Sequence, residues 1–97
     1  MARVRATAVR WESDDFPGFI EASVRDAGGE DHRIIDKVAV LTTLDITPGS
    51  TLPLELWIEA DIELVEAKGV QVTFKHGVRT VNGLGKLVVS ADDVTTD

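Results

Sequence analysis

The sequence predicts an all-β domain, a six-stranded antiparallel meander that forms a small barrel or barrel-like sandwich. Apolar and polar residues alternate with a period of two along most of the chain, as they do in half-buried strands. Segments that contain glycine or proline separate these runs and indicate turns. The mostly short links between successive runs favour a meander over a Greek key. The 97 residues fit one domain, spanning residues 1–97.

Three strands are expected in the first half of the chain, over residues 3–11, 19–26 and 32–41. The first two each present an apolar row to the core, made of Val4, Ala6 and Ala8 and of Ile20, Ala22 and Val24. In the third strand, the adjacent Ile34 and Ile35 break the alternation, which predicts a bulge at this point.

The clearest strand pattern runs over residues 53–65, after a connection over residues 42–52. Its apolar row is Leu54, Leu56, Ile58, Ala60, Ile62 and Leu64. Its other row is Glu55, Trp57, Glu59, Asp61, Glu63 and Val65. A straight strand of this length would span roughly 40 Å, whereas a compact domain of this size has a radius of gyration of about 13 Å. We therefore expect the strand to bend, as long strands do in small barrels.

A hairpin is expected to join this strand to the next one, over residues 70–78. Residues 67–69 end in glycine, which suits a three-residue loop. The apolar pairs in this register are Leu64 with Val72 and Ile62 with Phe74, and the outward pairs are Asp61 with Lys75 and Trp57 with Arg79. Opposite charges on facing strands favour this register.

A second hairpin is predicted at Asn82-Gly83, because this dipeptide favours a type I′ turn with positive φ at both central residues. The resulting register would place His76 in the inward row and pair Val78 with Leu87. Ser90 is expected to cap a single helical turn near the end of the sequence.

Composition narrows the classes of function. The formal net charge is −7, which disfavours binding to nucleic-acid phosphates. The sequence has no cysteine, so we expect neither disulfides nor thiolate metal sites. The sequence lacks a long apolar stretch of the kind that predicts a signal peptide or a membrane span. We therefore expect a cytoplasmic protein that binds neither nucleic acid nor membrane.

Motifs for catalysis or cofactor binding are not found in the sequence. The serines lack a Gly-x-Ser-x-Gly surround, and His32 and His76 are not spaced as metal ligands. Residues 12–15 are acidic but lack the alternating ligands of a calcium loop. Carboxylates on an open strand face lack the cleft that makes two acids chemically different. We expect no enzyme activity, no catalytic residue, no metal and no cofactor.

Trp57 is the most informative residue, because it lies in the outward, acidic row of residues 53–65. It either stacks on Arg79 as a cation–π pair or serves as an anchor for a partner. The second interpretation predicts a non-catalytic protein-interaction module, immunity- or inhibitor-like by analogy, that binds a basic protein. The expected partner-binding residues are Trp57, Glu55, Glu59, Asp61 and Glu63.

Two alternatives remain open at this point. The chain could be a small-ligand-binding or catalytic domain, with its site at a barrel mouth formed by His76, Trp11 and the loop over residues 12–19. It could also self-associate through an exposed edge strand such as residues 3–11, so a monomer or a weak homodimer is expected.

Overall fold

The computed structural model describes residues 2–13, 18–42 and 50–96, and it is an all-β structure. The strands are β1 (Ala2–Ser13), β2 (Phe19–Arg25), β3 (Asp31–Lys37), β4 (Leu54–Glu66), β5 (Gly69–Phe74), β6 (Lys86–Val89) and β7 (Val94–Thr95). One helical turn, α1 (Val38–Leu41), and one 3-10 turn (Ala91–Asp93) complete the described elements. The predicted fold class is confirmed.

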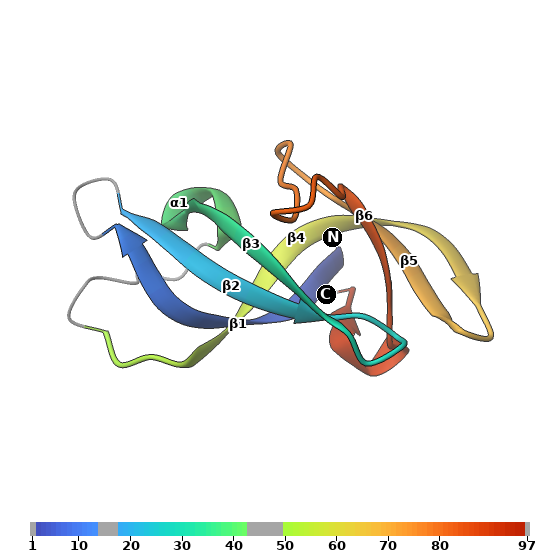
Figure 1. The fold of residues 1–97 in the computed structure, drawn as a ribbon. Helices are drawn as coiled ribbons and strands as arrows, with labels where there is room; N and C mark the ends of the chain where they lie inside the picture. Colours follow the sequence, from blue (N-terminus) through green and yellow to red (C-terminus); the bar gives the residue numbers. More distant parts are fainter. Residues whose placement is uncertain (1, 14–17, 43–49, 97) are drawn as a thin grey trace.

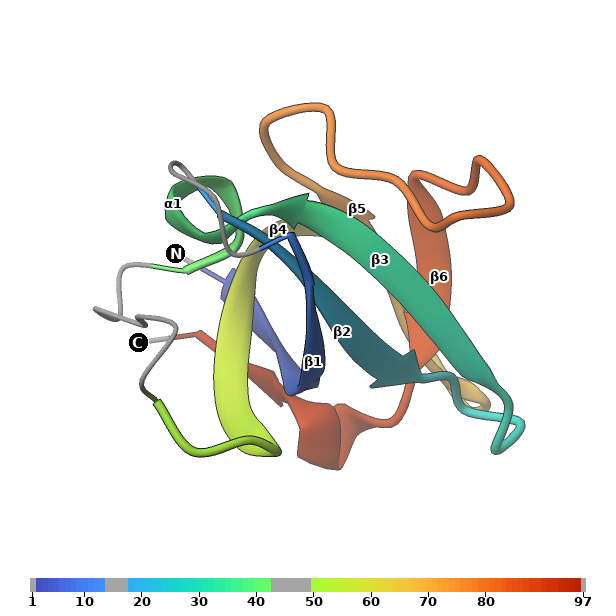
Figure 2. The same cartoon turned by 60° about the vertical axis from the view of Figure 1, so that its left-hand side comes forward.

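The sheet consists of two three-stranded meanders joined side by side. Its strand order is β3-β2-β1-β4-β5-β6, and β7 adds to β1. All neighbouring strands are antiparallel. The sheet curls into a half-barrel around the core (Figures 1 and 2), which confirms the six-stranded, barrel-like architecture. Because β4 returns to pair with β1, the first strand lies in the middle of the sheet and is not an exposed edge.

The two ends of the curled sheet are tied together by backbone hydrogen bonds. The N–H of Val81 donates to the carbonyl of Arg33 over 2.8 Å. The N–H of Ala27 donates to the carbonyl of Val88, also over 2.8 Å. These contacts satisfy polar groups near the edge strands β3 and β6, which would otherwise be open to pairing with another chain.

The core fills the inside of the curl with the predicted inward rows. Val4, Ile20 and Leu56 are fully buried, and the small residues Ala8 and Ala22 let neighbouring strands curl closely around them. The radius of gyration is 12.8 Å, near the value expected for a compact domain. In the described part of the chain, neither helical segment is long and apolar enough to cross a membrane.

The third predicted strand is shorter than expected, and its bulge is absent. β3 ends at Lys37, and the last four residues of the predicted range form α1 instead. Ile34 pairs with Ala22 and Ile35 with Glu21 in unbroken register. No bulge is needed because Ile34 is buried in the core while Ile35 is only half-buried on the other face. Most of the predicted connection over residues 42–52, namely residues 43–49, lies outside the described residues.

The register of the β4–β5 hairpin differs from the prediction. Glu66 pairs directly with Gly69, and a bulge at Glu63 then sets Ile62 opposite Val72 instead of Phe74. Gly69 is a buried strand residue and not part of a longer loop. A Cβ atom there would collide with the carbonyl oxygen of Val89, so the glycine is required by close packing.

The predicted register of the second hairpin, which pairs Val78 with Leu87, is also wrong. β5 ends at Phe74, and β5 pairs Val72 with Leu87. The 75–85 loop lies between β5 and β6, and within it Gly83 N–H donates to the Thr80 carbonyl over 2.8 Å. The Asn-Gly turn exists, but Asn82 does not have positive φ, so it is not type I′. The N-cap prediction is confirmed, since Ser90 Oγ accepts from the Asp92 N–H over 3.3 Å.

Candidate interaction face

The outer row of β4, meaning Glu55, Trp57, Glu59, Asp61 and Glu63, lies on one side of the strand. Its first members alternate with the buried residues Leu56, Ile58 and Ala60. Because β1 pairs with this half of β4, Arg5 faces Trp57 and Arg3 faces Glu59. The predicted partner-binding residues are therefore contiguous in space, and a basic strand lies beside them.

Trp57 stacks on Arg5. The predicted stacking partner, Arg79, is therefore wrong. The guanidinium carbon of Arg5 lies 4.9 Å from the centre of the Trp57 ring. The same guanidinium is 3.1 Å from Glu55 Oε2 and 3.3 Å from Asp93 Oδ1. Arg79 instead donates to the Gly83 carbonyl over 3.3 Å. Sequence reasoning missed Arg5 because the β1–β4 pairing joins segments about fifty residues apart, and local patterns do not encode such contacts.

The remaining acids of the outer row also have partners within the chain. Glu59 Oε2 is 3.2 Å from His76 Nε2, and Asp61 Oδ1 is 3.5 Å from Lys75 Nζ. Glu63 Oε1 accepts a hydrogen bond of 2.8 Å from the Thr73 hydroxyl. The Asp61–Lys75 contact is confirmed, although the two residues are diagonal because Asp61 pairs with Thr73.

His76 lies outside the core, contrary to the prediction. It follows the end of β5, adopts a positive φ of 61°, and leaves 56% of its side chain exposed. The early end of β5 explains this, because the inward row no longer continues past Phe74. His76, Glu59 and Trp57 border a pocket of about 40 Å³ beneath α1, which is room for about one water molecule.

The residues of the alternative barrel-mouth site are not brought together. Trp11 packs near Gly18, where an added Cβ would lie 3.1 Å from its ring. His76 contacts Glu59, which pairs with Arg3 near the opposite end of β1. Residues 14–17 of the proposed loop are outside the described residues. A larger depression, of about 400 Å³, lies under the 75–85 loop and includes Phe74 and Leu84.

The tip of the β4–β5 hairpin, residues 61–68, projects from the half-barrel at the right of Figure 1. All of these residues are exposed. The bulge at Glu63 sets Leu64 opposite Gln71 and Val65 opposite Val70. Facing residues share a side of the sheet, so Leu64 turns to the acidic side, against the predicted alternation. Ile62, Leu64 and Val65 are 38%, 52% and 69% exposed.

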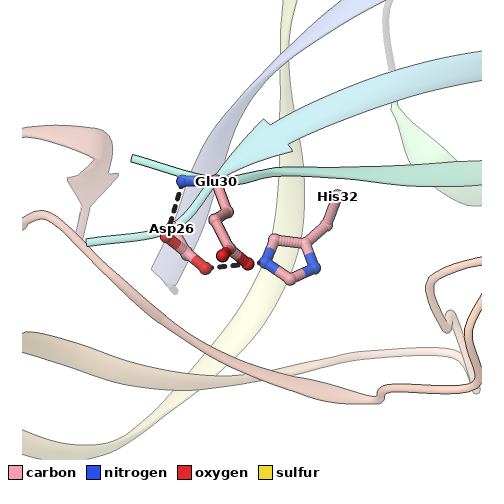
Figure 3. A group of neighbouring side chains, drawn as sticks. All are labelled: Asp26, Glu30 and His32. Carbon is pink, nitrogen blue, oxygen red and sulfur yellow. Dashed lines mark hydrogen bonds and ion pairs between the residues drawn. The ribbon is translucent and has the colours of Figure 1, made fainter. Parts of the chain in front are cut away.

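A histidine-containing turn connects β2 to β3 (Figure 3). Asp26 Oδ2 lies 2.7 Å from His32 Nε2. Its Oδ1 accepts the N–H groups of Gly28 and Glu30 over 2.9 and 3.0 Å. The hydrogen bond from His32, and then those from the backbone, lower the pKa of Asp26. The side chain of His32 is 14% exposed in this contact.

The side chains of Asp26, Glu30 and His32 bring ligand-type atoms within 4.8 Å of one another. Both oxygens of Asp26 are already engaged in hydrogen bonds of the turn. The arrangement is therefore explained as an Asp-centred turn that closes the β2–β3 hairpin.

Comparisons of the chain with protein-family models, with curated proteins and with solved structures found no match. A functional proposal therefore depends on the geometry of the surface itself.

Proposed function

We propose that the chain is a non-catalytic protein-interaction module that binds a basic protein through the outer row of β4. The observation that carries this proposal is the charge of the row, where acids surround the half-buried Trp57 and no basic residue occurs in the strand. Trp is enriched among binding anchors, and rim acids attract and orient a basic partner. Immunity and inhibitor proteins supply the functional analogy.

The ion pairs along the row leave its carboxylates accessible to a partner. The side chain of Glu55 is 54% exposed beside Arg5, and that of Asp61 is 63% exposed beside Lys75. Exposed pairs of this kind contribute about 0–1 kcal/mol each, so a partner's lysine or arginine can replace or join the internal cation. Stacking on Arg5 holds the Trp57 ring in one position, which lowers the entropy cost of binding.

The same geometry favours binding over acid–base catalysis. Two catalytic carboxylates need environments that push their pKa values apart, which is normally achieved by enclosing one of them. Here Glu55, Asp61 and Glu63 all lie on an exposed face. Glu59 is more enclosed, but the pocket beside it holds only about 40 Å³, too little for a substrate of ordinary size.

The test is a binding experiment with the double variant Trp57→Ala, Glu59→Lys. Wild-type protein is used to capture partners from a lysate of the source cells, and the captured protein is purified and titrated by calorimetry. The variant should bind this protein at least about tenfold more weakly, because it loses the anchor and opposes like charges. Wild-type affinity should also fall with added salt.

The matched control is Glu12→Lys, an exposed charge reversal on β1 whose side chain is 46% exposed. It should bind like the wild type. Melting curves of all variants establish that the proteins are folded. Equal affinity for the double variant and the control would contradict the proposal.

A further inference from the structure

The second half of β4 has an open backbone edge. β1 pairs with β4 only from Leu54 to Ala60, where its own described residues begin at Ala2. Residues 61–66 pair with β5 on one side. On their other side, none of the strands in residues 2–13, 18–42 and 50–96 forms a ladder with them. Figure 1 shows the corresponding hairpin extending beyond the rest of the sheet.

The backbone of Ile62 points to this open edge. Lys75 N–H donates to the Glu59 carbonyl over 3.1 Å, so Glu59 directs its carbonyl toward β5. Hydrogen-bonding groups alternate between the two sides of an antiparallel strand. Ala60 and Ile62 therefore direct their N–H and C=O groups the other way. Ala60 faces Ala2 of β1, whereas none of the described strands pairs with Ile62 on that side.

The open edge combines exposed apolar and acidic side chains. Ile62, Leu64 and Val65 are exposed, and Asp61, Glu63 and Glu66 flank them. Proteins normally protect such edges with lysine, proline or a covering segment, and residues 61–66 contain neither lysine nor proline. The bulge at Glu63 limits the length of regular pairing. An added strand would therefore be short.

Charge disfavours a second copy of the chain as the added strand. Antiparallel pairing of two such edges would bring Asp61, Glu63 and Glu66 of one chain against the same three acids of the other. Like charges on facing strands are destabilising, and each chain already carries a net charge of −7. A strand of opposite charge has no such penalty.

We propose that the edge at residues 61–66 accepts an extended segment of a basic partner protein as an added antiparallel strand. The segment would alternate lysine or arginine with apolar residues, so that cations meet Asp61 and Glu63 while apolar side chains cover Ile62. This inference rests on the proposed function, and it assigns the mode of binding and the class of partner segment.

The test uses the acetylated and amidated peptide Lys-Val-Lys-Val-Lys-Val and two matched peptides. One replaces every lysine with glutamate, and the other carries N-methyl groups on alternate residues, which block strand addition without changing the charge. The lysine peptide should bind saturably and slow hydrogen exchange of the Ile62 amide at least about tenfold. Neither matched peptide should protect this amide.

Variants of Ile62 test the same edge from the protein side. Ile62→Pro removes the N–H that faces the partner, and proline is tolerated at a free edge. It should weaken binding of the lysine peptide at least tenfold relative to Ile62→Val, which keeps the N–H. If Ile62→Pro does not fold, the N-methylated peptide provides the same comparison with unaltered protein.

The outcomes separate this inference from the proposed function. The inference is overturned if the lysine peptide does not bind, if it binds without protecting Ile62, or if its N-methylated form binds equally well. It is also overturned if light scattering shows a dimer whose formation alone protects Ile62. None of these results affects calorimetry of the whole partner with the Trp57→Ala, Glu59→Lys variant, which tests the proposed function itself.

Discussion

The two halves of β4 follow the same alternating pattern but have different environments. In residues 54–60, Leu56 and Ile58 are 0% and 1% exposed. In residues 61–66, Ile62 and Leu64 continue the sequence pattern but are 38% and 52% exposed. The first half has β1 on one side and core side chains beneath it, whereas β5 is the only described strand that pairs with the second half.

Alternation therefore identifies the faces of a strand but not what covers each face. Burial in β4 stops at Ala60, the last residue that pairs with the described part of β1, so the boundary depends on a contact between distant segments. The bulge at Glu63 sharpens the contrast, because it exchanges the faces of Leu64 and Val65 just beyond that boundary. The exposed half is consequently free to act as a surface while the buried half holds it in the sheet.

The largest expected effect comes from truncating the same residue type in the two halves. Leu56→Ala should lower the free energy of unfolding by about 2–5 kcal/mol, since it leaves a cavity in the core. Leu64→Ala should change it by less than about 0.5 kcal/mol, because the side chain is 52% exposed. Urea unfolding followed by tryptophan fluorescence measures both, and similar losses would show that the tip is packed as tightly as the core.

The attachment of the exposed half to the barrel is expected to be the next most sensitive feature. Gly69→Ala should cost about 2 kcal/mol or more, because its Cβ would collide with the Val89 carbonyl at a φ of +147°. The control Gly29→Ala has a φ of +89° and open space around the Cβ, so it should cost about 1 kcal/mol. Thermal melting measures the loss of stability in both variants. Equal losses would show that Gly69 is not required by close packing.

Much of the fold could be predicted from the sequence, because strand existence depends on local alternation. Val4, Ile20 and Leu56, for example, are buried in the rows where the pattern places them. The N-cap at Ser90 was also predictable, since its residues are adjacent. The registers of both later hairpins could not be predicted, because Gly69 and Asn82-Gly83 each suit more than one kind of turn. The contacts that decide between these turns are made with distant residues, such as Val89 beside Gly69 and Arg33 beside Val81.

The candidate site was predicted in composition but not in its contacts. The acidic row around Trp57 follows directly from period-two alternation. Its stacking partner, Arg5, required knowledge that β4 returns to β1. The open edge at Ile62 could not be foreseen either, since an edge is defined by which strands are missing from one side. Local sequence carries no information about that absence.

Removing the surface cations that contact the two halves of β4 should change the free energy of unfolding less than the substitutions above. Arg5→Ala should cost about 1–2 kcal/mol, because one guanidinium stacks on Trp57 and pairs with Glu55 and Asp93. Lys75→Ala should cost at most about 0.5 kcal/mol, because its pair with Asp61 is exposed. Chemical denaturation of both variants checks this order, and a larger loss for Lys75→Ala would reverse the comparison.

The smallest expected effect concerns the β2–β3 turn, which supports the root of the projecting hairpin. Ala27 in this turn donates its N–H to Val88, and its Cβ lies beside Gly69. Hydrogen bonds from His32 and the backbone lower the pKa of Asp26. The ionised carboxylate therefore contributes stability above the pKa of the unfolded chain, and this contribution is lost as pH falls through the lower folded-state pKa.

Asp26→Asn should consequently have a lower melting temperature than the wild type at pH 7, and the gap should narrow as the pH is lowered toward 3. His32→Leu is the companion variant, because it removes the hydrogen bond that lowers the pKa of Asp26 most, while keeping the backbone donors. The difference in melting temperature between His32→Leu and the wild type should also narrow as the pH is lowered toward 3. Melting curves of Asp26→Asn and wild type that stay parallel down to pH 3 would show that ionised Asp26 does not hold the turn, and with it the root of the exposed half.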